Sequence, residues 1–450
     1  MKNTLDTTDQ TRLSTALQRF KALYGDGDAQ VWRAPARINI IGEHVDYVSY
    51  LPTASLPFAS REHDMLMLCR ASDDGRIRGA STLERFPPFD FALDDERIED
   101  CARQTWEAFV FNRPAPVPHW SNYVKGAVLF ARWKYGASVK RGFDFLIESS
   151  IPPSSGASSS SALVVLAGAA TRETNQLKFN LDELARDSSQ AEWFIGTRGG
   201  ALDHMAICLA TVGGAVFILH GKRQAERVPL PDNRFRWLSF FSHPADKGHE
   251  VMLEYNERVA VSRLLIPAFL SNAKDGQAPK TITLDEVERL YPEVFRECER
   301  EFPDLVRERR SHPLKLRDRM RHHEGEAARV DAAVKVLREP HTSDEQKARV
   351  LGELMNGSHE SLRRFYGVST PEVERLVKVV NADMRVYGAR LMGGGFGGNV
   401  LALTTAENTQ ALIDRVQNEF YSPRGRDGYG EGSVMVSTPG NGLELINSRY

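Results

Sequence analysis

Residues 151–165 read IPPSSGASSSSALVV, and they join an extended apolar run, GFDFLIESSI, to a helix-forming run, ALVVLAGAA. This stretch predicts a strand that passes into a helix through a loop rich in Gly and Ser. Ser is an ordinary N-cap, because its oxygen accepts from the free N–H groups of the first helical turn. The same loop also suits a phosphate, because Gly lets the backbone approach an anion and the helix dipole favours negative charge there. Both interpretations are open on this stretch alone.

Composition narrows the class of protein. A chain of 450 residues with 41% apolar residues is long enough for more than one core, so we expect two lobes. Its 58 basic and 60 acidic residues balance, which argues against a nucleic-acid binder or a membrane-surface protein. The polar N-terminus has no signal-like core, and no apolar run could span a bilayer, so we expect a cytosolic protein. The four cysteines lie far apart and are expected to be free thiols: Cys69, Cys101, Cys208 and Cys298.

Strand-like and helical segments alternate in both halves of the chain. In the first half the patterns predict a helix over 11–25, strands over 30–42, 63–72 and 76–82, a helix over 120–136, a strand over 142–151, helices from about Ser160 and over 181–196, and a strand over 213–219. In the second half they predict a strand over 237–243, a helix over 250–270, charged helices over 272–345, helices over 348–367 and 370–382, and a turn-rich segment over 388–405. This order predicts an α+β fold of two lobes, 1–228 and 229–450, with the active site in the cleft between them.

A second motif, APARINIIGEHVDY, occupies residues 34–47. Its isoleucines would anchor the segment in a core. Arg37, Glu43, His44 and Asp46 would then stand at the edge as fixed donors and acceptors. Such a cluster suits a polyhydroxylated ligand, because sugar hydroxyls need matched hydrogen bonds to replace water. A salt-bridged surface turn is the alternative.

A third motif, LMGGGFGGNV, occupies residues 391–400 and has five glycines within six positions. Glycine weakens helices and strands, so this segment predicts a loop. The loop could approach a ligand closely or could simply be a tight turn.

The three motifs together resemble the galactokinase–homoserine kinase–mevalonate kinase–phosphomevalonate kinase (GHMP) superfamily, and within it the galactokinase family. The resemblance covers nearly the whole chain. Further segments that look like galactokinase segments, in galactokinase order, are WSNYVKG (120–126), AEWFIG (191–196), GGALDH (199–204), EYNER (254–258), MNGSHESLR (355–363) and GARLMGGGFGG (388–398).

The resemblance implies that the Gly/Ser loop wraps the phosphates of ATP. The residues it implies for ATP are Pro152, Ser154, Ser155, Gly156, Ala157, Ser158, Ser159, Ser160 and Trp120. We expect Trp120 and Tyr123 to shape the nucleotide pocket, and each could equally be a core residue. It implies a Mg²⁺ ion held by Ser160 and Glu192, which suits a hard cation that takes oxygen ligands. The lysine-bearing pattern GxxxxGK is absent, so backbone dipoles, hydroxyls and magnesium must meet the phosphate charge.

For the reaction itself, the resemblance implies Asp203 as the catalytic aspartate and Arg37 as the arginine beside it. The carboxylate would accept or orient the proton of the attacking hydroxyl, and the guanidinium would keep it ionised. Asp203 on its own could also be a helix N-cap. The implied sugar contacts are Glu43, His44, Asp46, Gly200 and Tyr255, of which Asp46 reads the side of the ring where galactose and glucose differ.

The chain also departs from the family pattern. VSYLP follows GEHVDY where NGG is usual, His204 follows the aspartate where Gln is usual, and Asn399 follows GGGFGG where Cys is usual. The first departure could reshape the sugar pocket. The histidine pair His322–His323 does not have the HExxH spacing, and we do not interpret it as a metal site.

The sequence thus predicts a cytosolic ATP-dependent sugar 1-kinase that converts galactose to galactose 1-phosphate. The alternatives are a kinase of arabinose, galacturonate or N-acetylgalactosamine, or a non-catalytic sugar and ATP sensor on the same fold. We expect a small sugar and ATP as partners, with no nucleic acid and no membrane. The oligomeric state is left open, with a monomer as one option.

Overall fold

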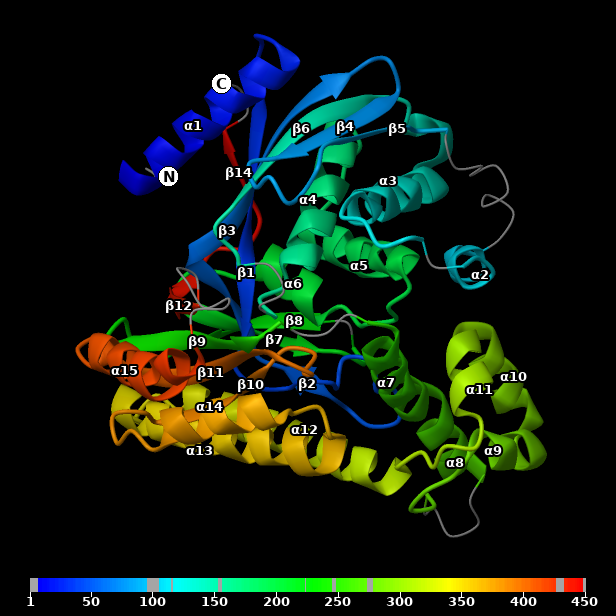
Figure 1. Cartoon of the computed structure of the whole chain (residues 1–450), viewed down its shortest axis with the longest axis vertical. Coiled ribbons are helices and arrows are strands. Elements are labelled where there is room, and N and C mark those ends of the chain that lie inside the picture. The colour runs from blue at the N-terminus through cyan, green and yellow to red at the C-terminus, as the bar shows by residue number, and fades with distance from the viewer. Residues whose placement is uncertain are drawn as a thin grey trace.

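The structure is a computed structural model that describes residues 7–94, 105–114, 116–152, 156–222, 224–244, 248–272, 278–425 and 433–447. Three sheets and a large set of helices make up the fold, so the predicted α+β class is confirmed (Figure 1). The described helices include none that is both long and apolar enough to cross a membrane. Cys69, Cys208 and Cys298 are buried free thiols, and Cys101 lies outside the described residues.

The largest sheet belongs mainly to the first half of the chain. Its strand order is β14 (Glu444–Asn447), β1 (Gln30–Asn39), β3 (Pro57–Ser72), β6 (Gly142–Ser149), β4 (Arg76–Ser81) and β5 (Phe89–Ala92), with β13 (Pro439–Gly440) paired to β3. Both faces of the middle of this sheet are covered, and the consecutive β3 residues Met65 to Cys69 are accordingly apolar and buried. Leu66 and Leu68 of β3 pack in the small core cluster that includes α1, whereas Met67 and Cys69 belong to the main core on the opposite face.

Among the described residues, six helices accompany the large sheet. They are α1 (Thr7–Tyr24), α2 (Trp106–Phe111), α3 (Ser121–Tyr135), α4 (Ser159–Thr174), α5 (Leu181–Ala191) and α6 (Leu202–Leu209). Helix α1 lies on one face, and α4 and α6 pack against β1 and β3 on the other (Figure 1). The N-terminal ends of α4 and α6 both reach the functional site described below. A short 3₁₀ turn, Glu192–Ile195, extends α5.

Two smaller sheets complete the core. One has the order β10 (Gly388–Met392), β11 (Gly398–Thr405), β9 (Phe235–His243) and β12 (Val434–Ser437), and the other has the order β2 (Ala54–Ser55), β7 (Gly214–Leu219) and β8 (Gln224–Pro229). Strands β13 and β14 bring the end of the chain back to the large sheet. The lobe boundary near residue 228 stays a prediction.

The helices of the second half lie beneath these sheets and to one side of them (Figure 1). They are α7 (His249–Ala260), α8 (Ile266–Asn272), α9 (Leu284–Leu290), α10 (Pro292–Glu301), α11 (Pro303–Arg309), α12 (Leu316–Arg338), α13 (Asp344–Ser361), α14 (Pro371–Asn381) and α15 (Thr409–Val416). In the part of the second half that the structure describes, three π-helical turns interrupt or extend these helices: Val261–Leu265, Leu362–Tyr366 and Gln417–Tyr421.

The predicted strands and helices are present, with changes of type in places, such as the π-helical turn Leu362–Tyr366 at the end of the helix predicted over 348–367. The single helix predicted over 250–270 is divided by the π-helical turn Val261–Leu265. Pro267 explains the change, because it has no N–H to bond the carbonyl four residues earlier, and a π turn absorbs the gap. The turn-rich segment 388–405 is a hairpin of β10 and β11 around the glycine loop.

Helix α13 and strand β10 cross at a pair of glycines. A Cβ atom on Gly352 would lie 2.1 Å from the carbonyl oxygen of Tyr387, and one on Gly388 would lie 2.1 Å from that of Gly352. By contrast, a Cβ on Gly357 in the same helix would meet only the flexible Arg329 side chain, at 3.5 Å.

We therefore expect opposite effects of two matched substitutions in α13. Gly352→Ala should lower the free energy of unfolding by about 1–3 kcal/mol through overpacking. Gly357→Ala should leave it unchanged or raise it by up to about 1 kcal/mol, since Ala is the better helix former. Urea unfolding followed by circular dichroism measures both, and equal effects at the two positions would contradict the close crossing.

Candidate active site

A cavity of about 220 Å³ lies where β1, α4, α6, α7 and the glycine loop meet. This volume lies below the usual range for ligand pockets of about 300–1,000 Å³ and suits a small molecule. Nine of the residues proposed from sequence line it: Arg37, Glu43, His44, Asp46, Ser160, Glu192, Gly200, Asp203 and Tyr255. Segments far apart in the chain thus converge on one site.

An ion pair between Arg37 and Asp203 forms one wall. The register of β1 with β3 shifts between Pro35 and Arg37, an irregularity that can re-aim a side chain. Nε and Nη2 of Arg37 lie 2.7 and 2.6 Å from Oδ1 of Asp203. The Arg37 side chain is 5% exposed and that of Asp203 is 29% exposed. The carboxylate is therefore held from behind and remains accessible from the cavity.

The charges around Arg37 keep it protonated. Burial by itself lowers the pKa of Arg37, but the carboxylates of Asp203, Glu43 and Asp46 outweigh it, and the net pKa is raised. Asp203 also lies in the first turn of α6, where the helix dipole favours negative charge. It is not the N-cap, which is Ala201.

Ser158 holds the other oxygen of Asp203. Its Oγ donates to Oδ2 of Asp203 at 2.6 Å, and it does not cap helix α4. Ser158 has a left-handed backbone, with φ of 61°, which costs energy for a non-glycine residue and is typical of functional sites. The Ser158 hydroxyl therefore binds the Asp203 carboxylate and does not cap α4. The helix N-terminus is left without a side-chain cap.

Glu192 forms a second polar group with two serines and a histidine. Ser161 donates to its Oε2 at 2.9 Å, and Nε2 of His204 lies 2.8 Å from the same oxygen. Burial raises the pKa of Glu192, but the interactions with His204, Ser161 and Ser160 outweigh it and the pKa is lowered. The unusual His204 therefore contacts the carboxylate that the sequence proposed as a metal ligand.

Asp46 is packed against Gly200. A Cβ atom on Gly200 would lie 2.4 Å from Oδ2 and 2.8 Å from the backbone oxygen of Asp46, so no larger residue fits without moving the motif. Burial raises the pKa of Asp46 to about 7, helped by the nearby charge of Asp203. Tyr255 completes this side of the cavity.

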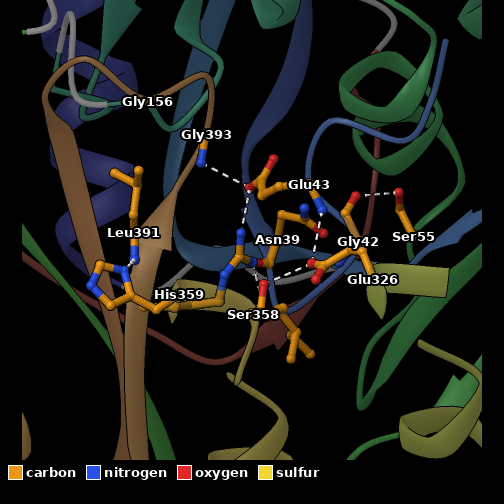
Figure 2. Close-up of polar contacts among 12 residues, drawn as sticks. Asn39, Gly42, Glu43, Ser55, Gly156, Glu326, Ser358, His359, Leu391 and Gly393 are labelled. Carbon is orange, nitrogen blue, oxygen red and sulfur yellow. Dashed lines mark hydrogen bonds and ion pairs between the residues drawn. The ribbon is translucent and has the colours of Figure 1, made fainter. Parts of the chain in front are cut away.

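Glu43 faces the cavity but also holds the glycine loop. Its Oε1 accepts from the Gly393 N–H at 2.8 Å and lies 3.3 Å from Nη2 of Arg390 (Figure 2). Burial raises the pKa of Glu43, but Arg390 and Arg37 outweigh it and the pKa is lowered. A Cβ on Gly393 would lie 3.2 Å from the carbonyl oxygen of Gly156, so the two glycine-containing loops touch.

Side chains from the second half of the chain hold the backbone of the motif 34–47, which we call the sugar motif after the ligand that the sequence predicts for it. Oε1 of Glu326 in α12 accepts from the N–H groups of Gly42 and Glu43, at 2.9 and 3.3 Å, and from the Ser358 hydroxyl (Figure 2). Arg390, which is fully buried, donates to the carbonyls of Asn39 and Ile40. No sequence motif marks Glu326, and Arg390 lies within GARLMGGGFGG without a role that the motif assigns to it; the fold brings both side chains to residues 39–43.

Several residues proposed for ATP lie outside this cavity. Ala157 and Gly156 accept hydrogen bonds from Arg37 through their carbonyls, at 3.3 Å each. Pro152 and Ser159 flank the same loop and do not line the cavity. Ser154 and Ser155 lie outside the described residues.

Trp120 stands apart from the cavity. Its ring packs against Phe89, with centroids 4.6 Å apart, and its Nε1 donates to the carbonyl of Pro87. Its assignment to ATP stays a prediction.

Other cavity residues were not singled out for the site by sequence reasoning. They are Tyr47, Ser161, Ser189, Trp193, Thr197, Gly199, Leu202, His204 and Gly394. Gly394 could have been found from the sequence, because it belongs to the glycine-rich motif 391–400. Ser161 and His204 were visible only as neighbours of the proposed Ser160 and Asp203.

Three family models match the chain. The galactokinase galactose-binding signature matches residues 18–59, the GHMP kinases N terminal domain residues 122–211, and the GHMP kinases C terminal domain residues 341–422. The chain is 31% identical to a galactokinase of Chloroflexus aggregans, over 96% of this chain and 98% of that protein. It is 28% identical to a galactokinase of Lactococcus lactis subsp. cremoris, over 92% of each.

Solved structures share the fold. A crystal structure of Lactococcus lactis galactokinase complexed with galactose matches with a TM-score of 0.74 at 24% identity, covering 96% of this chain and 99% of that one. The Methanococcus jannaschii mevalonate kinase matches with a TM-score of 0.54 at 16% identity, covering 94% and 99%.

The raised pKa of Asp46 predicts a pH-dependent cost to stability. The folded state keeps a proton on this carboxyl from its ordinary pKa of 3.8 up to about 7, so folding takes up a proton in this range. The free energy of unfolding contributed by Asp46 therefore falls as the pH rises through that window. Asp46→Asn removes the cost and should stabilise the protein more at about pH 8 than at about pH 5, by about 1–3 kcal/mol.

Urea unfolding at the two pH values measures this difference. Asp331→Asn, at an exposed position of α12, is the matched control and should show no such pH dependence. A gain from Asp46→Asn that is equal at both pH values would contradict the raised pKa.

Proposed function

Because the chain belongs to the galactokinase family of GHMP kinases, we propose that its cavity transfers the terminal phosphoryl group of ATP to the anomeric hydroxyl of galactose. The observation that carries the proposal is the Asp203 carboxylate, fixed by Arg37 and Ser158 at the cavity wall. The sugar motif and a helix N-terminus face the same space.

In this proposal Asp203 receives or orients the proton of the attacking hydroxyl. Both of its oxygens are held by donors, so the carboxylate cannot rotate away, and positioning of this kind lowers the barrier. Arg37 pairs with this carboxylate and offers positive charge near the transferred group.

The phosphates of ATP would lie at the start of helix α4. Ser158 does not cap this helix, so first-turn N–H groups can face an anion, and the dipole adds to the attraction. Gly156 and Gly393 let the two loops come together without side chains between them. These contacts would hold the nucleotide in place of a lysine.

A Mg²⁺ ion fits the group around Glu192. The carboxylate and the hydroxyls of Ser160 and Ser161 are hard oxygen donors, which is the set that magnesium prefers. These residues would hold the ion, and the ion would neutralise phosphate charge when bound. His204 would keep the Glu192 carboxylate in its orientation.

The sugar would be read by Asp46, Glu43, His44 and Tyr255 around Gly200. A buried acceptor that is matched to one C4 configuration is left unpaired by the other epimer. That loss costs about 1–3 kcal/mol, or roughly one to two orders of magnitude in kcat/KM.

We also propose that the enzyme works in the cytosol on free sugar and ATP. The buried thiols of Cys69, Cys208 and Cys298 are unpaired, as expected in a reducing compartment.

ADP release measured across a panel of sugars tests the proposal. We expect kcat/KM for galactose to exceed that for its C4 epimer glucose by at least about tenfold, and Asp46→Ala to reduce both the activity and this ratio. Arabinose, galacturonate and N-acetylgalactosamine belong in the panel. A preference for one of these would replace galactose as the substrate, and no turnover of any sugar would overturn the kinase proposal.

A further inference from the structure

A chain of buried hydrogen bonds runs from His44 into the helical half of the protein. Nδ1 of His44 lies 2.8 Å from the hydroxyl of Tyr47, which lies 2.8 Å from the hydroxyl of Tyr366. The Tyr366 hydroxyl lies 3.4 Å from Oγ of Ser262. All four residues are less than 9% exposed. Ser262 and Tyr366 each belong to a π-helical turn, a feature frequent at functional sites.

A second arm reaches Ser262 from the other side. Nε2 of His323 lies 3.2 Å from Oγ of Ser262, and Nδ1 of His323 lies 2.7 Å from the hydroxyl of Tyr50. Tyr50 belongs to VSYLP, the segment that departs from the family pattern. Ser262 also lies 2.7 Å from the carbonyl oxygen of Arg258, one helical turn earlier. Ser262 is therefore a branch point with three polar neighbours.

Counting protons at this branch point gives the direction of each hydrogen bond. A serine hydroxyl has one proton, and a carbonyl can only accept, so the proton of Ser262 goes to Arg258. Ser262 must then accept from its other two neighbours. His323 accordingly donates from Nε2–H, and its bare Nδ1 accepts from Tyr50. Tyr366 donates to Ser262 in the same way.

The remaining hydrogen bonds between Tyr366 and the cavity have the same direction. Since Tyr366 has given its proton to Ser262, it accepts from Tyr47, and Tyr47 in turn accepts from His44. We propose that Ser262 thereby fixes the tautomer of His44, with the proton on Nδ1 and a bare Nε2 at the cavity. His44 lines the cavity, and its buried Nε2 makes no hydrogen bond with the described residues.

Two further observations support this direction of the hydrogen bonds. Burial lowers the pKa of His44 to about 3 and that of His323 well below its ordinary value, so both rings are neutral near pH 7. The reverse direction would place a proton on Nε2 of His44. The Gly394 backbone lies near enough to favour a proton on this ring, but Nε2 has no hydrogen-bond partner among the described residues. The reverse direction would also leave the contact between Tyr366 and Ser262 without a proton. The proposed direction therefore makes one more hydrogen bond among the described residues than the reverse direction does.

The tautomer decides which kind of ligand group can form a hydrogen bond with His44. A bare Nε2 needs a donor, so a sugar hydroxyl satisfies it, whereas an ionised carboxylate at that position would meet a lone pair and remain unpaired. His44 thereby selects a neutral sugar over a uronic acid. This consequence rests on the proposed function, but the tautomer itself is a property of the protein without ligand.

Long-range ¹H–¹⁵N spectra of the ligand-free full chain, labelled with ¹⁵N in histidine only, test the tautomer directly. The His44 signals are assigned by their loss in His44→Gln. We expect Nδ1 to be pyrrole-like and Nε2 pyridine-like. Ser262→Ala removes the acceptor for Tyr366, and Tyr366→Phe removes the proton that Ser262 accepts. In both variants Tyr47 should turn its proton toward His44, so the two ring nitrogens should exchange character.

Tyr50→Phe is the matched control, because it removes a hydroxyl from the arm that does not lead to His44, and the His44 tautomer should stay unchanged. Ser262→Ala should also raise the Kd for galactose by roughly three- to tenfold while the Kd for ATP stays within about twofold. A proton on Nε2 of His44 in the unmodified protein would overturn the proposal. So would an unchanged His44 spectrum in Tyr366→Phe, which keeps the ring and therefore the packing. If the spectra are as expected but the protein does not bind galactose, the tautomer proposal stands and only the proposed function is contradicted.

Discussion

The ion pair between Arg37 and Asp203 is the contact on which the arrangement of the cavity depends. A guanidinium that is 5% exposed would be costly without a partner, so the fold must bring a carboxylate to the end of β1. Asp203 at the start of α6 supplies it, and Ser158 at the start of α4 holds its second oxygen. One buried charge therefore determines how two helix N-termini meet the edge of the large sheet.

Strain and close packing accompany this arrangement. His44 and Ser158 both have a left-handed backbone, although neither is glycine. Gly200 leaves room for Asp46, and Gly156 and Gly393 bring their loops into contact. The cost of these features is offset by hydrogen bonds from the second half of the chain, above all from Glu326 and Arg390 to the sugar motif. The site is thus held by residues that lie outside the cavity.

Much of the fold and of the candidate site was predictable from the sequence. The rest was not predictable, and the reasons are physical. Local patterns predicted the strand-to-helix junction before α4 and the glycine loop between β10 and β11, since Gly, Ser and apolar periodicity act over short distances. The motifs also marked Arg37, Asp46 and Asp203, which the fold brings together. Glu326, Arg390 and Ser262 come from ordinary helix and strand patterns. Tertiary packing places Glu326 and Arg390 on the motif and Ser262 at the end of the hydrogen-bond chain from His44, and although Arg390 lies within GARLMGGGFGG, no local pattern shows these contacts.

Measurement of phosphoryl transfer in a single turnover by Asp203→Asn tests the account most directly. Asn keeps the size of the side chain and loses its charge. We expect a rate at least about 100-fold below that of the unmodified enzyme, with the Kd values for ATP and galactose within about threefold, because the carboxylate acts on the reacting hydroxyl. Thermal unfolding of the same variant confirms that it is folded. A folded variant with a near-normal rate would contradict the role of the Arg37–Asp203 pair.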